Sequence, residues 1–206
     1  MRILFQGDSI TDWFRDYNDD TRLGSGYAQL VAASLGFSEP GEHTFINKGI
    51  SGNRVVDLYA RIKRDIINYR PDVMSILIGV NDVWHELGDS PNGVDADKFY
   101  KVYSMLLDEV FEALPNIKIM ILEPFALEAC STSANWEYFR TETKKRAKMA
   151  KKIAEKYNLP FIPLQAGFDE LAKKTGNSYW LGDGVHPTAA GHEFIKNEWL
   201  KAYKTL

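Results

Sequence analysis

The chain has 206 residues, of which 45% are hydrophobic and 26% are charged, a balance that is ordinary for a soluble globular domain with a sizeable core. Its formal net charge of -3 gives no electrostatic reason to expect a nucleic acid or an anionic membrane as a partner. Cys130 is the only cysteine, which excludes an internal disulfide bond and argues against a cysteine-based metal site. We find neither the apolar region of a signal peptide nor an apolar stretch long enough to span a bilayer, so we expect a cytoplasmic protein.

Short apolar runs alternate with helical patterns along the chain. Five runs are predicted to be strands, at residues 3–6, 44–47, 73–78, 117–122 and 160–162. Two of them are almost continuously apolar, which is typical of strands that are covered on both faces. Strands that alternate with helices predict a parallel sheet with helices on both sides. Because no repeat or linker divides the chain, we expect one α/β domain over residues 1–206.

Four segments show the period of a helix. The first has the apolar stripe Val55, Leu58, Ile62 and Ile66, and the second has Phe99, Val102, Leu106 and Val110. We expect the first helix to end at Arg70, because the residue before a proline is disfavoured in α conformation. A longer polar helix is expected over residues 136–157, with the basic residues of 144–152 on its solvated face. The last helix is expected to begin near Thr188.

The first apolar run leads directly into Gly7, Asp8 and Ser9. Open α/β sheets place their chemistry at the carboxyl ends of strands, so a serine at this point is a candidate nucleophile. The alternative is an ordinary strand-to-helix turn capped by Asp8 and Ser9, and the tripeptide alone favours that alternative. The segment is not the nucleophile elbow of α/β-hydrolases, which has a glycine where this chain has Thr11.

An aspartate and a histidine lie close together near the other end of the chain, in the stretch GDGVHP at residues 182–187. His186 can supply the base that a serine hydroxyl needs near neutral pH. Asp183 can fold back onto the second ring nitrogen and orient the imidazole. The alternative is a helix start in which Asp183 favours the helix dipole and His186 is a surface residue, and this segment alone leaves both interpretations open.

Two residues that follow the second and third predicted strands can donate hydrogen bonds to a negatively charged oxygen. Gly52 offers a backbone N–H that no side chain shields, and Asn81 offers a side-chain amide. Taken singly, each is more simply a turn residue. Their joint placement after successive strands, in a chain that also has Ser9 and the Asp183/His186 pair, favours a site for acyl transfer.

Other polar residues near these turns have simpler interpretations. Asp8, Asp12 and Asp82 are explained by turn capping, and His192 by helix packing. No histidines have the spacing of a zinc site. We therefore expect neither a metal ion nor another cofactor.

These segments resemble the blocks of the GDSL or SGNH hydrolase family, in the family's order and spacing, from end to end of the chain. The matching segments are GDSI at 7–10, glycine at 52, GVND at 79–82 and DGVHP at 183–187. The one departure is Ile10, where the family name has leucine. The resemblance implies a three-layer, flavodoxin-like fold with five parallel strands in the order 2-1-3-4-5.

The resemblance also implies the roles of the site residues. Ser9 would be the nucleophile, and Asp183 and His186 would complete the catalytic triad. The backbone N–H of Ser9, Gly52 and the Asn81 amide would form the oxyanion hole.

Three longer stretches, at 47–53, 78–84 and 185–192, are similar to the intracellular bacterial acetylxylan esterases of this family. This similarity implies a serine esterase that removes acetyl groups from sugar hydroxyls, such as those of xylo-oligosaccharides, and it suggests a homo-oligomer. One alternative is a thioesterase or lysophospholipase that acts on long acyl chains, and another is acetyl transfer onto a sugar. A non-catalytic carbohydrate-binding protein on the same fold is the alternative of another class, although binding alone needs no Ser9/His186 pair.

Three of the five tryptophans lie close in sequence to the proposed site residues, namely Trp13, Trp84 and Trp180. Pyranose rings present C–H faces that pack on aromatic planes, so these indoles could form a sugar platform or a small acyl pocket. Packing in the core is an equally open interpretation for these three. For Trp136 and Trp199 it is the preferred one.

Overall fold

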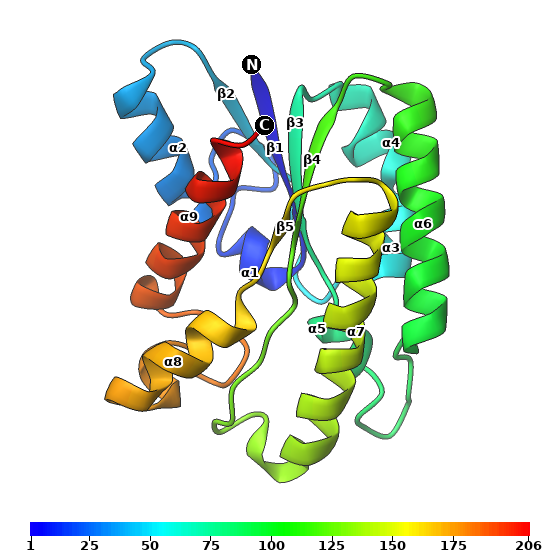
Figure 1. The fold of residues 1–206 in the computed structure, drawn as a ribbon, viewed down its shortest axis with the longest axis vertical. Coiled ribbons are helices and arrows are strands. Elements are labelled where there is room, and N and C mark those ends of the chain that lie inside the picture. The colour runs from blue at the N-terminus through cyan, green and yellow to red at the C-terminus, as the bar shows by residue number, and fades with distance from the viewer.

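The computed structural model describes all 206 residues, as a sheet between two layers of helices (Figure 1). The strands are β1 (Arg2–Gly7), β2 (Thr44–Asn47), β3 (Val73–Leu77), β4 (Lys118–Leu122) and β5 (Phe161–Ile162). All neighbouring strands are parallel, and the sheet has the order β2-β1-β3-β4-β5. The predicted fold class and strand order are therefore confirmed, and each predicted strand is present to within one residue at either end.

Nine α-helices surround the sheet. They are α1 (Ser9–Asp12), α2 (Tyr27–Ser38), α3 (Val55–Ala60), α4 (Ile62–Asp65), α5 (Val80–Trp84), α6 (Ala96–Ala113), α7 (Trp136–Lys156), α8 (Gln165–Thr175) and α9 (Ala189–Tyr203). Three short 3-10 helices lie at Ile67–Tyr69, Ser133–Asn135 and Asn177–Tyr179. Helices α2, α8 and α9 cover one face of the sheet, and α3, α4, α6 and α7 cover the other (Figure 1). None of the helices combines the length and the hydropathy that a bilayer-spanning segment requires.

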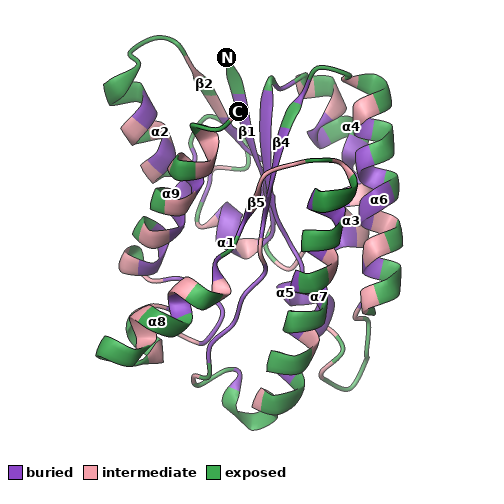
Figure 2. Cartoon of the chain, viewed as in Figure 1, coloured by how far each residue is buried: buried purple, intermediate pink, exposed green.

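The strands are buried on both faces, as Figure 2 shows, and successive residues of a strand enter different cores. Leu4 belongs to the core that also contains Phe99 of α6, whereas its neighbour Phe5 packs with Tyr27 of α2 and Trp199 of α9 in the other core. This alternation follows from the period of two along a strand. It explains why most buried strand positions are apolar, with Gln6, Asn47 and Ser75 as the buried polar exceptions.

The apolar stripe of residues 55–66 is buried as predicted, but the prediction of one continuous helix there is wrong. The chain forms α3, then α4, then a 3-10 turn, because Arg61 leaves helical geometry with φ -112° and ψ 14°. Its guanidinium points inward and donates hydrogen bonds to Gln6 Oε1 (2.7 Å) and to the Lys48 carbonyl (2.8 Å). The segment ends as predicted at Arg70, which is left-handed in front of Pro71.

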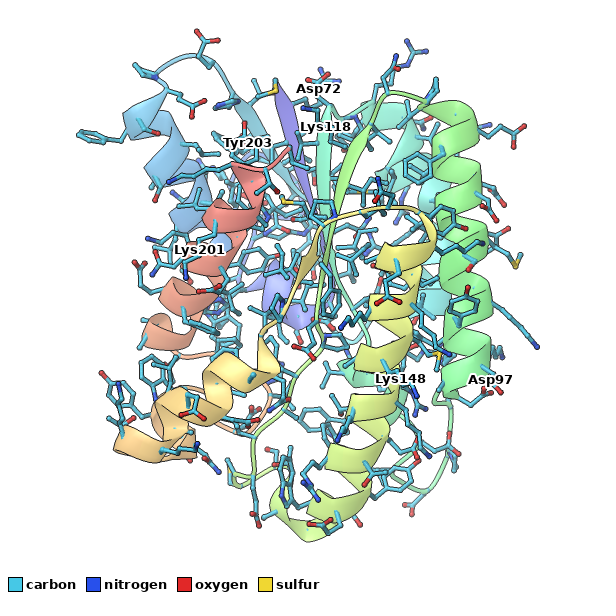
Figure 3. The ribbon with its side chains drawn as sticks, viewed as in Figure 1. Asp72, Asp97, Lys118, Lys148, Lys201 and Tyr203 are labelled. Atoms are coloured by element: carbon cyan, nitrogen blue, oxygen red, sulfur yellow. The ribbon has the colours of Figure 1, made fainter.

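The long helix α7 also differs from its prediction in one respect. Figure 3 shows Lys148 on its exposed face, but Arg146 is buried and does not belong to the solvated basic face. The Arg146 guanidinium donates two hydrogen bonds to the Val94 carbonyl (3.0 and 2.6 Å) and forms an ion pair with Glu142. This arginine fixes the loop in front of α6 to α7.

Candidate active site

The turn after β1 places Ser9 at the carboxyl edge of the sheet, as the first residue of α1. Asp8 caps this short helix, because its Oδ1 accepts a hydrogen bond from the Ile10 N–H (3.0 Å). Gly7 is required at the end of the strand. A Cβ at this position would lie 2.4 Å from the Leu77 carbonyl oxygen and 2.4 Å from Thr11 Oγ1.

The structure brings Ser9, His186 and Asp183 into one chain of hydrogen bonds, although Ser9 and His186 are 177 positions apart in the sequence. Ser9 Oγ lies 2.8 Å from His186 Nε2, and His186 Nδ1 lies 2.7 Å from Asp183 Oδ2. The ionised carboxylate can only accept, so Nδ1 carries the hydrogen and Nε2 is left to accept from the serine hydroxyl. Asp183 is held in turn by the backbone N–H groups of Val185 (2.9 Å) and His186 (2.8 Å), which donate to its Oδ1.

Asp183 and His186 each stabilise the charged form of the other. Partial burial alone would raise the pKa of Asp183, but the hydrogen bonds from the His186 ring and from two backbone N–H groups outweigh it and lower the pKa to about 2. The hydrogen bond to Asp183 raises the pKa of His186 above 6.5, against the opposing effect of burial. At neutral pH the carboxylate is therefore ionised and able to stabilise a positive imidazole.

Gly52 and Asn81 line the same cavity as Ser9 and His186, with a volume of about 760 Å³. We call it the polar cavity, since most of its other lining residues are polar. Gly52 has φ +80°, and no heavy atom lies within 4 Å of where its Cβ would be. Its N–H donates to no group of the protein. One N–H of the Asn81 amide donates to the Asn53 carbonyl (3.1 Å), which fixes the orientation of the amide at the cavity wall.

A second cavity, of about 660 Å³, opens on Ser9 and His186 and is lined by the aromatic side chains of Trp13, Phe14 and Tyr17. We call it the aromatic cavity. The Trp13 ring stacks on His186 with a centroid distance of 5.9 Å and also contacts His192 at 4.8 Å.

Of the other tryptophans, Trp84 lies in the wall of the polar cavity, 6.2 Å from the His186 ring. Trp180 lines neither cavity, and its indole N–H donates to Thr175 Oγ1 (2.8 Å). The structure thus brings two of the three proposed tryptophans to the Ser9–His186 pair and leaves Trp180 outside. Trp199 is fully buried, and Trp136 packs partly buried against the same core.

Comparisons with known proteins agree with this geometry. A model of the GDSL-like lipase/acylhydrolase family matches residues 5–194. The chain belongs to this family and is a carboxylic ester hydrolase. An acetylxylan esterase from Geobacillus stearothermophilus is 35% identical to it over 208 residues, covering 97% of this chain and 92% of the esterase.

Solved structures of family members superpose closely. A protein described as a GDSL-like lipase from Parabacteroides merdae has a TM-score of 0.92 at 38% identity, covering 98% of this chain and 94% of that chain. The Geobacillus stearothermophilus acetylxylan esterase has a TM-score of 0.86 at 33% identity, covering 98% and 93%. Structures of that esterase include variants described as catalytic mutants, in which a serine, an aspartate or a histidine is replaced by alanine.

The acidic residues near this GDSL-type site do more than cap turns, so the interpretation of them as caps is incomplete. Asp12 Oδ2 accepts hydrogen bonds from the backbone N–H (3.1 Å) and the hydroxyl (2.8 Å) of Ser51. Asp82 accepts from the Val55 N–H at 3.1 and 3.2 Å and so joins α5 to α3. Asp8 and Asp82 are buried, and burial raises the pKa of each to about 7.

Two arginines that the sequence analysis did not single out hold the loop that carries Gly52. Arg15 Nε donates to the Gly49 carbonyl (2.6 Å), and Arg61 Nε donates to Asn53 Oδ1 (2.8 Å). Arg61 also donates to the Gly7 carbonyl (3.2 Å), directly before the turn that carries Ser9. No sequence pattern marks these residues, because their partners are mostly carbonyls of segments far away in the chain.

His192 is buried and packs as predicted. Its Nδ1 accepts a hydrogen bond from the Tyr27 N–H (3.1 Å), and burial lowers its pKa to about 4. The neutral ring therefore packs against the Trp13 indole without competing with His186 for a proton. No group of three histidine, cysteine, aspartate or glutamate side chains is arranged to hold a metal ion.

Proposed function

We propose that the protein is a serine esterase that removes acetyl groups from sugar hydroxyls, with acetylated xylo-oligosaccharides as substrates. Residues 1–206 act as a single hydrolase domain. The hydrogen-bonded chain from Ser9 through His186 to Asp183, open to a cavity with amide donors, is the observation that supports this function most strongly. The substrate class is supported by the acetylxylan esterase that matches nearly the whole chain.

The reaction proceeds in two steps through an acetyl-enzyme. His186 Nε2 takes the hydroxyl proton while Ser9 Oγ attacks the ester carbonyl carbon, and the carbonyl electron pair moves onto oxygen. The N–H groups of Ser9 and Gly52 with the Asn81 amide hold this oxyanion. The intermediate collapses, the carbon–oxygen bond to the sugar breaks, and His186 returns the proton to the departing hydroxyl.

The second step uses the same groups. His186 removes a proton from water as the water oxygen attacks the acetyl carbon, and collapse of the second intermediate releases acetate and returns the proton to Ser9 Oγ. Asp183 stabilises the positive imidazole in both steps and does not itself take the proton.

Replacement of the nucleophile tests this assignment. Ser9→Ala is expected to lower kcat by about 10³- to 10⁶-fold in acetate release from acetylated xylo-oligosaccharides. A fluorophosphonate should label the unaltered protein at Ser9 and leave Ser9→Ala unlabelled. Ser38→Ala, at the exposed end of α2, is the matched control and should retain both activity and labelling. Near-full activity in Ser9→Ala would refute the mechanism.

The substrate class needs a separate measurement. Ethyl esters of acetate, butyrate and octanoate, compared with acetylated xylo-oligosaccharides, should show the highest kcat/KM for the acetyl esters. A preference for octanoate would instead indicate a lipolytic acylhydrolase.

A further inference from the structure

Two aromatic side chains that line the aromatic cavity are unusually exposed to solvent. Phe14 is 82% exposed and Tyr17 is 57% exposed, directly beside Ser9 and His186. The Tyr17 ring is held in place from two sides, because its hydroxyl donates to Asp12 Oδ2 (2.5 Å) and the Arg15 guanidinium lies 4.2 Å from its centroid. A fixed aromatic ring at the mouth of a cavity is ready to bind a flat apolar face.

The backbone at this place is strained. Trp13 has φ 29° and Phe14 has φ 63°, so two consecutive residues other than glycine lie in the left-handed region. The Ser25 N–H holds the turn by donating to the Trp13 carbonyl (3.0 Å). Backbone strain of this kind is unfavourable and is concentrated at functional sites. Here it turns the Trp13 indole onto His186 and leaves the Phe14 ring in the solvent.

The oxyanion donors decide which part of an ester faces which cavity. Gly52 and Asn81 line the polar cavity and not the aromatic one, so the carbonyl oxygen of a bound ester points into the polar cavity. The acetyl methyl group needs little room. His186, which returns the proton to the departing alcohol, borders both cavities. The aromatic cavity is therefore available for the ring of that alcohol.

The chemistry of the aromatic cavity matches a pyranose ring. Its aromatic planes suit the C–H face of the sugar. The Ser51 hydroxyl in the same wall donates its proton to Asp12, so its oxygen can accept a hydrogen bond from a sugar hydroxyl. We propose that Trp13, Phe14 and Tyr17 form the subsite that binds the pyranose ring bearing the acetyl ester. This proposal rests on the proposed esterase function and adds where the sugar lies. Of the three tryptophans named from the sequence it uses Trp13, together with Phe14 and Tyr17, and not Trp84 or Trp180.

The test is a ratio of two activities for each variant, namely kcat/KM for acetylated xylobiose divided by kcat/KM for ethyl acetate, which has no ring. Phe14→Ala should lower this ratio about tenfold, the change expected from the loss of about 50 Å² of buried apolar contact. Phe14→Trp should restore it, because the larger ring keeps the stacking plane. The matched control is Phe37→Ala, which removes a phenylalanine that is 91% exposed on α2, away from both cavities, and should leave the ratio unchanged.

Several results would overturn the subsite. An unchanged ratio in Phe14→Ala would do so while leaving the esterase function intact. A change confined to the preference between ethyl acetate and ethyl octanoate would show that the cavity holds acyl chains. A change only in sedimentation would show that Phe14 lies between copies of the chain. If the unaltered protein hydrolyses neither ester, the proposed function fails first and the subsite with it.

Discussion

The Asp12 carboxylate holds Ser51 by two hydrogen bonds, from the backbone N–H and from the hydroxyl, and so ties the loop that carries Gly52 to α1, the helix that begins with Ser9. A donor for an oxyanion is effective only when it is already in place, because reorientation during the reaction costs free energy. Asp12 contacts Ser51, the neighbour of Gly52, and not Gly52 itself. We therefore expect Asp12 to be a positioning residue, which holds the Gly52 N–H in place through Ser51.

Asp12→Ala is expected to lower kcat for ethyl acetate about 10- to 100-fold with little change in KM, since the donor is displaced and the binding surface for so small an ester remains. Asp12→Asn, which keeps an acceptor oxygen for Ser51, should recover part of the loss. Asp97→Ala, at the exposed start of α6 (Figure 3), is the control. A rise in KM with unchanged kcat would contradict the positioning role.

The pH dependence of the reaction should report His186. The imidazole must be neutral to accept the Ser9 proton, and its hydrogen bond to Asp183 raises its pKa above 6.5. The value of kcat/KM should therefore be low at acid pH and increase as the pH rises through that raised pKa. Asp183→Asn should move this limb to lower pH and reduce the rate by about 10⁴-fold. A limb that stays at the same pH in Asp183→Asn would exclude His186 as the titrating group.

Asp82 should make the stability of the fold depend on pH. Burial raises its pKa to about 7 in the folded protein, so the native state holds a proton that the unfolded chain releases near pH 4. The resulting stabilisation is complete below the unfolded pKa and is lost as the pH rises to about 7 and above. The amide of Asp82→Asn never ionises. The Tm of this variant minus the Tm of the unaltered protein should therefore increase between pH 5 and pH 8. Parallel Tm curves for the two proteins would contradict this, and Asp97→Asn serves as the control.

Gly49 should tolerate no side chain. A Cβ there would lie 2.3 Å from the Asp12 backbone nitrogen, where the loop that carries Gly52 packs against α1. Gly49→Ala is expected to lower both Tm and activity. Gly36→Ala, inside α2 with no atom within 4 Å of the added Cβ, should raise the stability by about 0.5–1 kcal/mol. Equal effects of the two substitutions would refute the packing argument.

The sequence predicted the strands well because each is a short apolar run, and a strand with two buried faces has no polar alternative. It was less informative about helices that have apolar residues on their exposed face as well. Helix α2 buries Tyr27, Val31 and Leu35 on one face but exposes Phe37 to solvent, so its sequence shows little contrast between the two faces. The break at Arg61 could not be predicted either, since it depends on carbonyls that only the folded chain brings near.

The same contrast applies to the site. The meeting of Ser9 and His186 was expected because parallel strands end at one edge and each residue lies in a recognisable segment. Trp180 was chosen only for lying three residues before Asp183. In an irregular loop, that spacing does not fix the direction of a side chain, and the indole turns to Thr175 instead.

The distance along the chain between Ser9 and His186 has a consequence for synthesis on the ribosome. Ser9 follows the first strand, but His186 is synthesised only after all five strands, directly before α9. A nascent chain that ends shortly before His186 would contain every strand of the sheet and still lack the base that we propose for ester cleavage. Hydrolytic activity would therefore begin only once translation has passed residue 186, which makes it a reporter of translation through that point.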